Sequence, residues 1–437
     1  MLGLAQRDRQ TARDEIMKRI AIFAIGLFFG GSVIVSEACG SNDSASPGAP
    51  GNADGGGDTG SSTGDGGARD AEPSGDGGAC THNGATADDR VRNVLISKPF
   101  AASGDPATLF EVLSLAVDGT LTRTGVTFAM GTASTSAIQF TPDGKIAMVA
   151  QDDGSIGVVR FDASGPVVVH TALKGAFYAG AIAIDATGSR AYVLDGDTTN
   201  NGGGVYAFDI GCDGTLSPRG LVVPGSTANQ MAFIPGSSRA VLSAGAAFDS
   251  PDGSDTDLVD FSGATPALVA SGSGFVDGGA IVSSITVMPD GKFALAADNG
   301  IIVGNRLAAI AIPSMKNAGI IATGNPALVL ASPYDNAALI LNSDTADAIR
   351  VATYDSTATP PFTMVGQINY VFPKPQLPSY ASLIGRGSLK GRVLIAENTA
   401  VRQVAFEPDA GIVDVAFLNF DQDGGLDQIV GVIGVEP

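Results

Sequence analysis

Carboxylates that could bind a cation gather in one short segment of the chain. Asp249, Asp252, Asp255 and Asp257 are interspersed with Ser, Gly and Pro. Hard carboxylate oxygens suit Ca²⁺, although this segment lacks the spacing and the final Glu of an EF-hand loop. Asp is also a favoured turn residue. The sequence therefore indicates a candidate Ca²⁺ site, with plain turn formation as the alternative.

Residues for acid–base or nucleophilic chemistry are few. The chain has two histidines, His82 and His170. It contains no Gly-x-Ser-x-Gly, His-Glu-x-x-His or Cys-x-x-Cys pattern. Asp298 and Arg306 are the pair we would test for hydrolysis. No motif fixes a reaction, so whether the protein is an enzyme stays open, with a non-enzymatic role favoured.

The N-terminal cysteine follows an export signal. Met17-Lys18-Arg19 precedes the apolar run Ile20 to Val35, which is shorter than the roughly 20 residues that a membrane-spanning helix requires. Ser36-Glu37-Ala38-Cys39 resembles a bacterial lipobox, which implies lipidation of Cys39. Cleavage near Ala38 that leaves a free thiol is the alternative. We expect residues 1–38 to be a signal peptide whose true start is Met17, and the membrane to be a partner through the lipid anchor.

A low-complexity segment follows the lipobox. Residues 39–88 are rich in Gly, Ser and Asp and poor in apolar side chains, so they cannot offset the entropy of ordering. We expect a disordered tether with a mean reach of about 40 Å. Cys80 and Cys212 could form a disulfide in an oxidising envelope, or remain two separate thiols.

The rest of the chain, residues 89–437, repeats at intervals of roughly 45 residues. The repeat is an apolar strand, a tight turn and a second apolar strand, as in Ala137 to Ala150 and Ser284 to Ala297. Two further strands follow, for example Ile156 to Phe161 and Val167 to Thr171. Pro-Asp-Gly suits the turn, because Pro presets φ and Gly accepts positive φ.

Six complete copies are visible, and the two chain ends complete a seventh. Val91 to Ser97 reads as a second strand without a first, and residues 428–437 read as a first strand without a second. Joining them removes the open edges of an unfinished sheet. We predict an all-β, seven-bladed β-propeller with four antiparallel strands per blade, in which the C-terminal strand closes blade 1.

The strand–Pro-Asp-Gly-Lys–strand units, with Val117-Asp118-Gly119-Thr120-Leu121 and Cys212-Asp213-Gly214-Thr215-Leu216, resemble the lactonase-type propellers of the YVTN-repeat and 6-phosphogluconolactonase-like superfamily. The resemblance covers about residues 90 to 437. It implies the fold and, more weakly, either a lactonase-like hydrolase or a surface protein.

The pattern also predicts a separation of charge between the two faces of the propeller. Carboxylates fall in the loops between second and third strands, whereas bases end most turns between first and second strands. The carboxylates are Asp105, Asp152, Asp153, Asp195, Asp197, Asp249, Asp252, Asp255, Asp257, Asp298, Asp344, Asp347 and Glu397; the bases are Lys145, Arg190, Arg239, Lys292, Arg386, Lys390 and Arg392. From residue 91 onward only four Glu occur, Glu111, Glu397, Glu407 and Glu436, and this imbalance favours turn chemistry as the reason for the many Asp.

Composition narrows the class of partner. The net charge of −20 argues against nucleic acid, because phosphate binding requires clusters of Lys and Arg. We expect a monomer without a cofactor, anchored in the bacterial cell envelope and sorted to the outer membrane. Its propeller would bind or scaffold an unknown protein, glycan or small molecule; the alternative is hydrolysis of a small cyclic ester at the central funnel.

Overall fold

The computed structural model describes residues 80–83, 89–100, 108–132, 137–195, 203–224, 228–244, 256–275, 282–298, 305–343, 348–375, 377–409, 411–420 and 428–437. Of the predicted calcium ligands, only Asp257 is among them. Cys39, Asp249, Asp252 and Asp255 lie outside the described residues, as do Asp105, Asp197, Asp344 and Asp347.

The strands form seven antiparallel four-stranded sheets, so the predicted fold is confirmed. Blade 1 combines β28 (Ile433–Val435), β1 (Arg92–Lys98), β2 (Thr108–Leu115) and β3 (Leu121–Met130). Blade 2 contains β4 (Ala137–Phe140), β5 (Ile146–Ala150), β6 (Ile156–Asp162) and β7 (Gly165–Leu173), and blade 3 contains β8 (Ala179–Ile184), β9 (Arg190–Asp195), β10 (Gly204–Ile210) and β11 (Leu216–Pro224).

The remaining four blades follow in chain order. Blade 4 contains β12 (Ala228–Phe233), β13 (Arg239–Ala244), β14 (Thr256–Asp260) and β15 (Ala267–Gly272), and blade 5 contains β16 (Val282–Val287), β17 (Phe293–Asp298), β18 (Arg306–Ala311) and β19 (Lys316–Ala322). Blade 6 contains β20 (Pro326–Ala331), β21 (Ala337–Asn342), β22 (Ile349–Tyr354) and β23 (Phe362–Gln367), and blade 7 contains β24 (Pro378–Leu383), β25 (Arg392–Glu397), β26 (Ala400–Phe406) and β27 (Ile412–Asn419).

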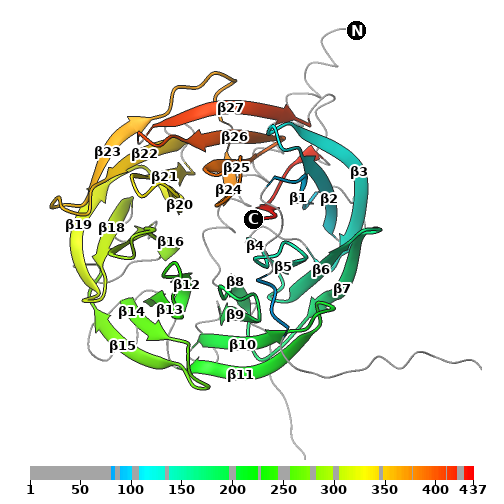
Figure 1. Ribbon diagram of the computed structural model, residues 1–437, viewed down its shortest axis with the longest axis horizontal. Helices are drawn as coiled ribbons and strands as arrows, with labels where there is room; N and C mark the ends of the chain where they lie inside the picture. The colour runs from blue at the N-terminus through cyan, green and yellow to red at the C-terminus, as the bar shows by residue number, and fades with distance from the viewer. Residues whose placement is uncertain are drawn as a thin grey trace, which may run out of the picture. The chain divides into compact units, whose positions relative to one another are not determined.

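The blades form a ring, with their first strands at the centre and their fourth strands on the rim (Figure 1). Neighbouring first strands contact one another around the ring, from β4 through β24 to β28. No α-helix occurs in the described residues, and so none there is long and apolar enough to cross a membrane.

Burial explains why the second strands were easy to recognise. Every residue of β5 is buried, because both faces of a blade pack against neighbouring blades, and a strand buried on both faces is an unbroken apolar run. The outer strand β15 is largely exposed.

The connections between strands lie on two opposite sides of the propeller. We call the side with the first-to-second turns (such as 141–145) and third-to-fourth turns (such as 116–120) the turn face, and the side with the second-to-third loops (such as 151–155) and inter-blade links the loop face.

The two chain ends close blade 1 as predicted. Ile433, Gly434 and Val435 pair with Ile96, Leu95 and Val94. The regular strand is shorter than the predicted 428–437, although Gly431 and Val432 still exchange backbone hydrogen bonds with Ser97. The carboxylate of Glu436 then accepts hydrogen bonds from Arg90 at 2.5 Å and from the side chain of Asn93 at 2.7 Å.

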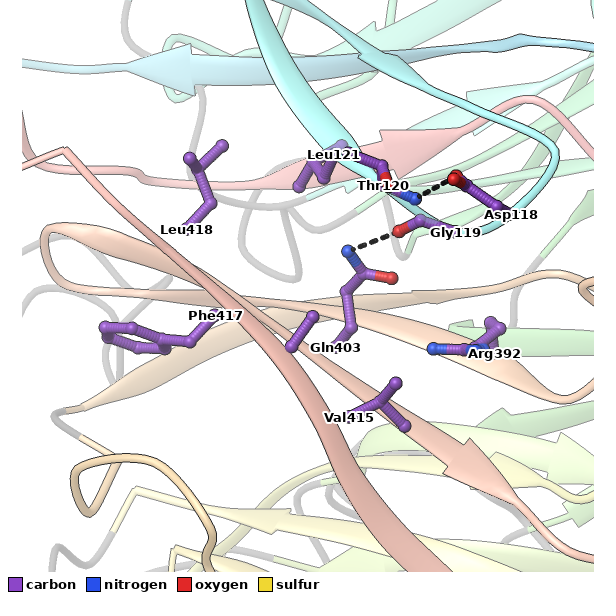
Figure 2. Close-up of a pocket in the computed structure, with 10 residues that line it drawn as sticks. Asp118, Gly119, Thr120, Leu121, Arg392, Gln403, Val415, Phe417 and Leu418 are labelled. Carbon is purple, nitrogen blue, oxygen red and sulfur yellow. Dashed lines mark hydrogen bonds between the residues drawn. The ribbon is translucent and has the colours of Figure 1, made fainter.

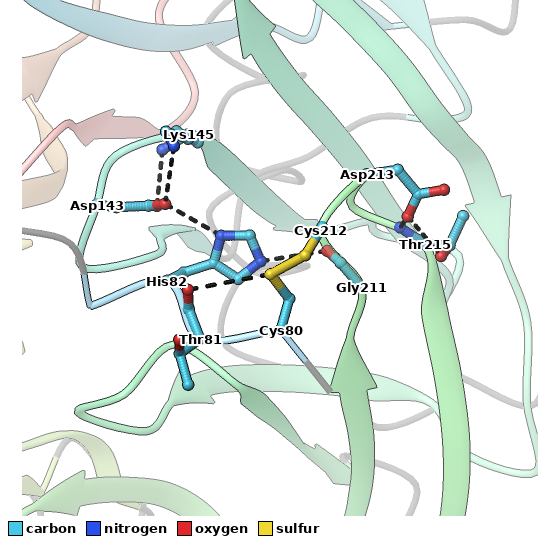
Figure 3. The surroundings of a disulfide bond; sticks show 9 residues. All are labelled: Cys80, Thr81, His82, Asp143, Lys145, Gly211, Cys212, Asp213 and Thr215. Carbon is cyan, nitrogen blue, oxygen red and sulfur yellow. Dashed lines mark hydrogen bonds and ion pairs between the residues drawn. A yellow bond between two sulfur atoms is a disulfide. The ribbon is translucent and has the colours of Figure 1, made fainter. Parts of the chain in front are cut away.

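The folded unit begins earlier than the predicted boundary at residue 89. Cys80 and Cys212 form a disulfide, one of the two arrangements considered above. His82 is buried, with Nδ1 3.1 Å from Asp143 Oδ2 and Nε2 3.2 Å from the Gly211 carbonyl oxygen (Figure 3). The segment Cys80–His82 therefore lies across the turns of blades 2 and 3. Composition could not reveal this, because three specific contacts outweigh a locally polar sequence.

Candidate functional site

Several charged side chains at the loop face are buried and paired with one another. In blade 7, Arg402 is fully buried, and its guanidinium contacts Glu397 and lies 2.6 Å from Asp414 Oδ2. Its Cζ lies 5.4 Å from the ring centroid of Tyr370 and 5.2 Å from that of Phe417. Burial alone would lower the pKa of Arg402, but the two carboxylates raise it.

Blades 1 and 5 repeat this arrangement. Asp298 Oδ2 lies 2.7 Å from Arg306 Nε, and Arg306 stacks over Phe275. In blade 1, Glu111 bridges Lys98 at 2.9 Å and Arg123 at 2.6 Å, and both cations lie over Phe420. In each of the three blades a ring that meets the cation comes from the inter-blade link before that blade: Tyr370, Phe275 or Phe420. These contacts therefore fasten three links to the blades that follow them.

For two residues this result corrects the predicted acidic loop face. Asp298 and Glu397 were expected to contribute negative charge to that face, but both are at most 2% exposed and each is paired with an Arg. The sequence pattern does not reveal the compensating partners, because Arg306 and Arg402 lie on third strands rather than in the turns that carry the other bases. Asp195 is also buried and accepts a hydrogen bond from the Tyr178 amide. Asp152 and Asp153 remain partly exposed.

The other predicted residues take structural roles where they are described. Asp257 accepts a hydrogen bond from Ser271 at 2.7 Å. His170 Nε2 accepts one from the Leu216 amide of the next blade. No group of three His, Cys, Asp or Glu side chains in the described ranges is placed to hold a metal ion. Since the other three predicted ligands lie outside those ranges, Ca²⁺ binding stays a prediction.

Bases on the turn face are compensated too. Arg190 and Arg239 open the second strands of blades 3 and 4, directly across from Asp209 and Asp260 on the third strands. The Nε–Oδ distances are 3.5 and 3.4 Å. Lys145 and Lys292 similarly pair with the Asp of their own turns. Each of these bases therefore has an Asp beside it, which offsets part of the positive charge predicted for this face.

Arg392 departs from this rule. It opens the second strand of blade 7 as Arg190 and Arg239 do in their blades, but the residue across from it is Ala405. Its side chain has no hydrogen bond or ion pair with any described residue. It lines a cavity of about 320 Å³ between blades 7 and 1, together with Gln403 and the turn that contains Gly119 (Figure 2). Sequence comparison flagged Arg392 only as one of several turn bases, and it missed Gln403.

Solved structures of lactonase-type β-propellers superpose on this chain. A candidate 6-phosphogluconolactonase from Bacteroides uniformis superposes with a TM-score of 0.58 at 13% identity, covering 79% of this chain and 99% of that one. A periplasmic gluconolactonase from Pseudomonas aeruginosa gives 0.55 at 14% identity, covering 75% and 96%. This chain has the lactonase-like β-propeller fold.

A further neighbour of this propeller carries no known activity. A functionally unknown protein from Desulfotomaculum acetoxidans superposes with a TM-score of 0.54 at 15% identity, covering 78% of this chain and 98% of that one. No protein-family model and no curated protein matches the sequence. At these identities the propeller shares its fold with these neighbours, and function must be argued from its own side chains.

Proposed function

We propose that this protein is a cell-envelope lipoprotein whose β-propeller is a binding module. The observation that carries the binding role is the cavity between blades 7 and 1. There Arg392 has no carboxylate partner among the described residues, whereas its counterparts in blades 3 and 4 have one. A charge left uncompensated beside a cavity is typical of a ligand site rather than of a structural contact.

The Cys80–Cys212 disulfide supports the proposed location. Structural disulfides persist in oxidising compartments such as the bacterial periplasm and cell surface. Together with the lipobox-like sequence at Cys39, it favours export followed by lipid anchoring. Multiple acyl chains, at about 0.8 kcal/mol per buried CH₂, would hold the protein at the membrane.

Fractionation of cells tests the location. The Cys39→Ser variant is expected to move from the membrane fraction to the soluble fraction, whereas Cys80→Ser, which leaves the lipobox intact, should remain with the membrane. Retention of Cys39→Ser in the membrane fraction would refute the anchor.

A lactonase-like hydrolase is the second candidate, favoured by the structural neighbours described as lactonases. Incubating the purified protein with a panel of aliphatic and sugar lactones tests it. We expect no hydrolysis above the uncatalysed rate, because Asp298 and Arg306 neutralise each other in a buried pair. Hydrolysis that disappears in a folded Asp298→Asn or Arg306→Met variant would instead establish the enzyme.

A further inference from the structure

The cavity between blades 7 and 1 presents two groups of opposite character that have no partner among the described residues. The first is the Arg392 guanidinium. It lies beside Gly119: a Cβ added to that glycine would be 3.6 Å from Arg392 Cζ and Nη2. The guanidinium therefore sits in contact distance of the turn that forms one wall of the cavity.

The second group is the amide of Gln403. This residue is 1% exposed, and its Nε2 donates a hydrogen bond of 3.1 Å to the Gly119 carbonyl oxygen. That bond fixes which end of the amide is the oxygen. Oε1 is buried and has no hydrogen-bond partner among the described residues. An unsatisfied buried acceptor of this kind costs roughly 1–3 kcal/mol, so a donor supplied by a ligand would be favourable.

Apolar side chains from both blades form part of the walls between these groups. Leu121, Val415 and Leu418 line the cavity (Figure 2). Asp118 lies at the exposed rim, where its carboxylate accepts a hydrogen bond from the Thr120 amide at 2.8 Å. It makes no ion pair with Arg392 in the described structure, and its negative charge opposes the approach of an anion.

We infer that this cavity binds a small organic acid that carries a hydroxyl or amino group near its carboxylate. The carboxylate would pair with Arg392, whose planar guanidinium matches two carboxylate oxygens. The hydroxyl or amino group would donate to Gln403 Oε1. The cavity volume of about 320 Å³ is at the lower end for ligand sites, which restricts the ligand to a small molecule. This inference names a ligand class for the binding role proposed above and rests on it.

Calorimetric titration of the full chain, purified in mild detergent, tests the ligand class with matched pairs of probes. Glycerate is compared with propionate, which lacks both of its hydroxyl groups. Malate is compared with succinate, which lacks its single hydroxyl group. We expect at least one hydroxy acid to bind, and its partner to bind roughly tenfold more weakly because Gln403 Oε1 stays unsatisfied. Glycerol, which lacks the acid, should not bind.

Variants assign the binding to the two side chains. Arg392→Met should weaken hydroxy-acid binding at least tenfold, whereas Arg239→Met, which alters the equivalent but paired arginine of blade 4, should leave it unchanged. Gln403→Leu should lower the affinity for glycerate to that for propionate without changing the latter. Asp118→Asn should strengthen binding by removing a repulsive charge. Thermal melting without ligand confirms that each variant is folded.

Several outcomes would overturn the inference. They are no binding of either hydroxy acid, equal binding within both pairs, preference for inorganic phosphate over all the organic acids, or unchanged affinity in Arg392→Met. Failure here is separable from failure of the proposed location. If the probes fail while Cys39→Ser is released from the membrane, the ligand class is wrong and the anchor stands; the reverse result refutes the anchor alone.

Discussion

At the scale of single residues, the two acidic residue types, Asp and Glu, have partly different roles. Asp is the turn residue: Asp118, Asp213 and Asp355 each accept a hydrogen bond from the backbone amide two positions later. Glu is used for buried ionic contacts, since Glu111, Glu397 and Glu436 are at most 2% exposed and paired with cations. Asp also serves in buried ion pairs, since Asp298 pairs with Arg306 and Asp414 with Arg402.

Asp153 combines both uses and gives a prediction of pH dependence. Partial burial raises the pKa of Asp153, but hydrogen bonds from Ser155 and the ammonium of Lys174 prevail and lower this pKa to about 2. A carboxyl group whose pKa is lower when folded stabilises the protein above its unfolded value near 3.8, and this stabilisation is lost as the pH falls towards 2. We expect Asp153→Asn to lower Tm at pH 6, and this effect to shrink as the pH falls through 2, where Asp153 becomes protonated. Thermal melts across this range measure it; a difference independent of pH would contradict it.

The four Glu residues also show how much of the site the sequence could have revealed. Their rarity beyond residue 90 indicates turn chemistry as the reason for the many Asp, which the Asp contacts support. The same rarity also sets apart the Glu residues, three of which are buried partners of cations. Gln403 and the pairing of Arg392 with Ala405 had no such signal, because both depend on the strand register.

At the scale of elements, the buried charge clusters join links to blades. The cation of each cluster lies over a ring from the preceding link, at 5.1 to 5.6 Å from the ring centroid. The ends of the second strands that carry these clusters were predictable to within about a residue, since their cores are apolar runs. The links were not, because only the assembled ring brings Phe275, Tyr370 and Phe420 to the charges.

Removing the cation from one cluster should be more damaging than removing the whole cluster. Arg402→Met leaves Glu397 and Asp414 buried and uncompensated, so we expect a loss of about 3–5 kcal/mol in the free energy of unfolding. Adding Glu397→Gln and Asp414→Asn to the same chain should restore most of that loss. Urea unfolding measures both variants, and a triple variant as unstable as the single one would show that packing rather than charge is decisive.

At the scale of the whole molecule, two contacts between distant segments hold the ring. The Cys80–Cys212 disulfide spans 132 residues and fixes the start of the folded unit against blades 2 and 3. In the chain-entropy description, closing a loop of this size reduces the conformational entropy of the unfolded chain and thereby stabilises the folded state by about 5 kcal/mol. The second contact is β28 in blade 1. The sequence predicted this closure because an apolar C-terminal run and an N-terminal run without a first strand each required a partner.

Loss of the last ten residues should therefore disrupt the entire ring rather than one blade. Val432, Ile433 and Val435 belong to two core clusters that blade 1 shares with blades 7 and 2, and removing them also leaves β1 as an unpaired inner edge. We expect a chain that ends at residue 427 to lose its cooperative thermal transition and to aggregate, whereas Glu436→Gln, which keeps β28 but weakens its contact with Arg90, should melt cooperatively at a lower Tm. Calorimetry compares the three proteins, and adding a synthetic peptide of residues 428–437 should restore the transition of the shortened chain. A shortened chain that melts cooperatively within a few degrees of the full protein would mean that the other six blades close the ring unaided.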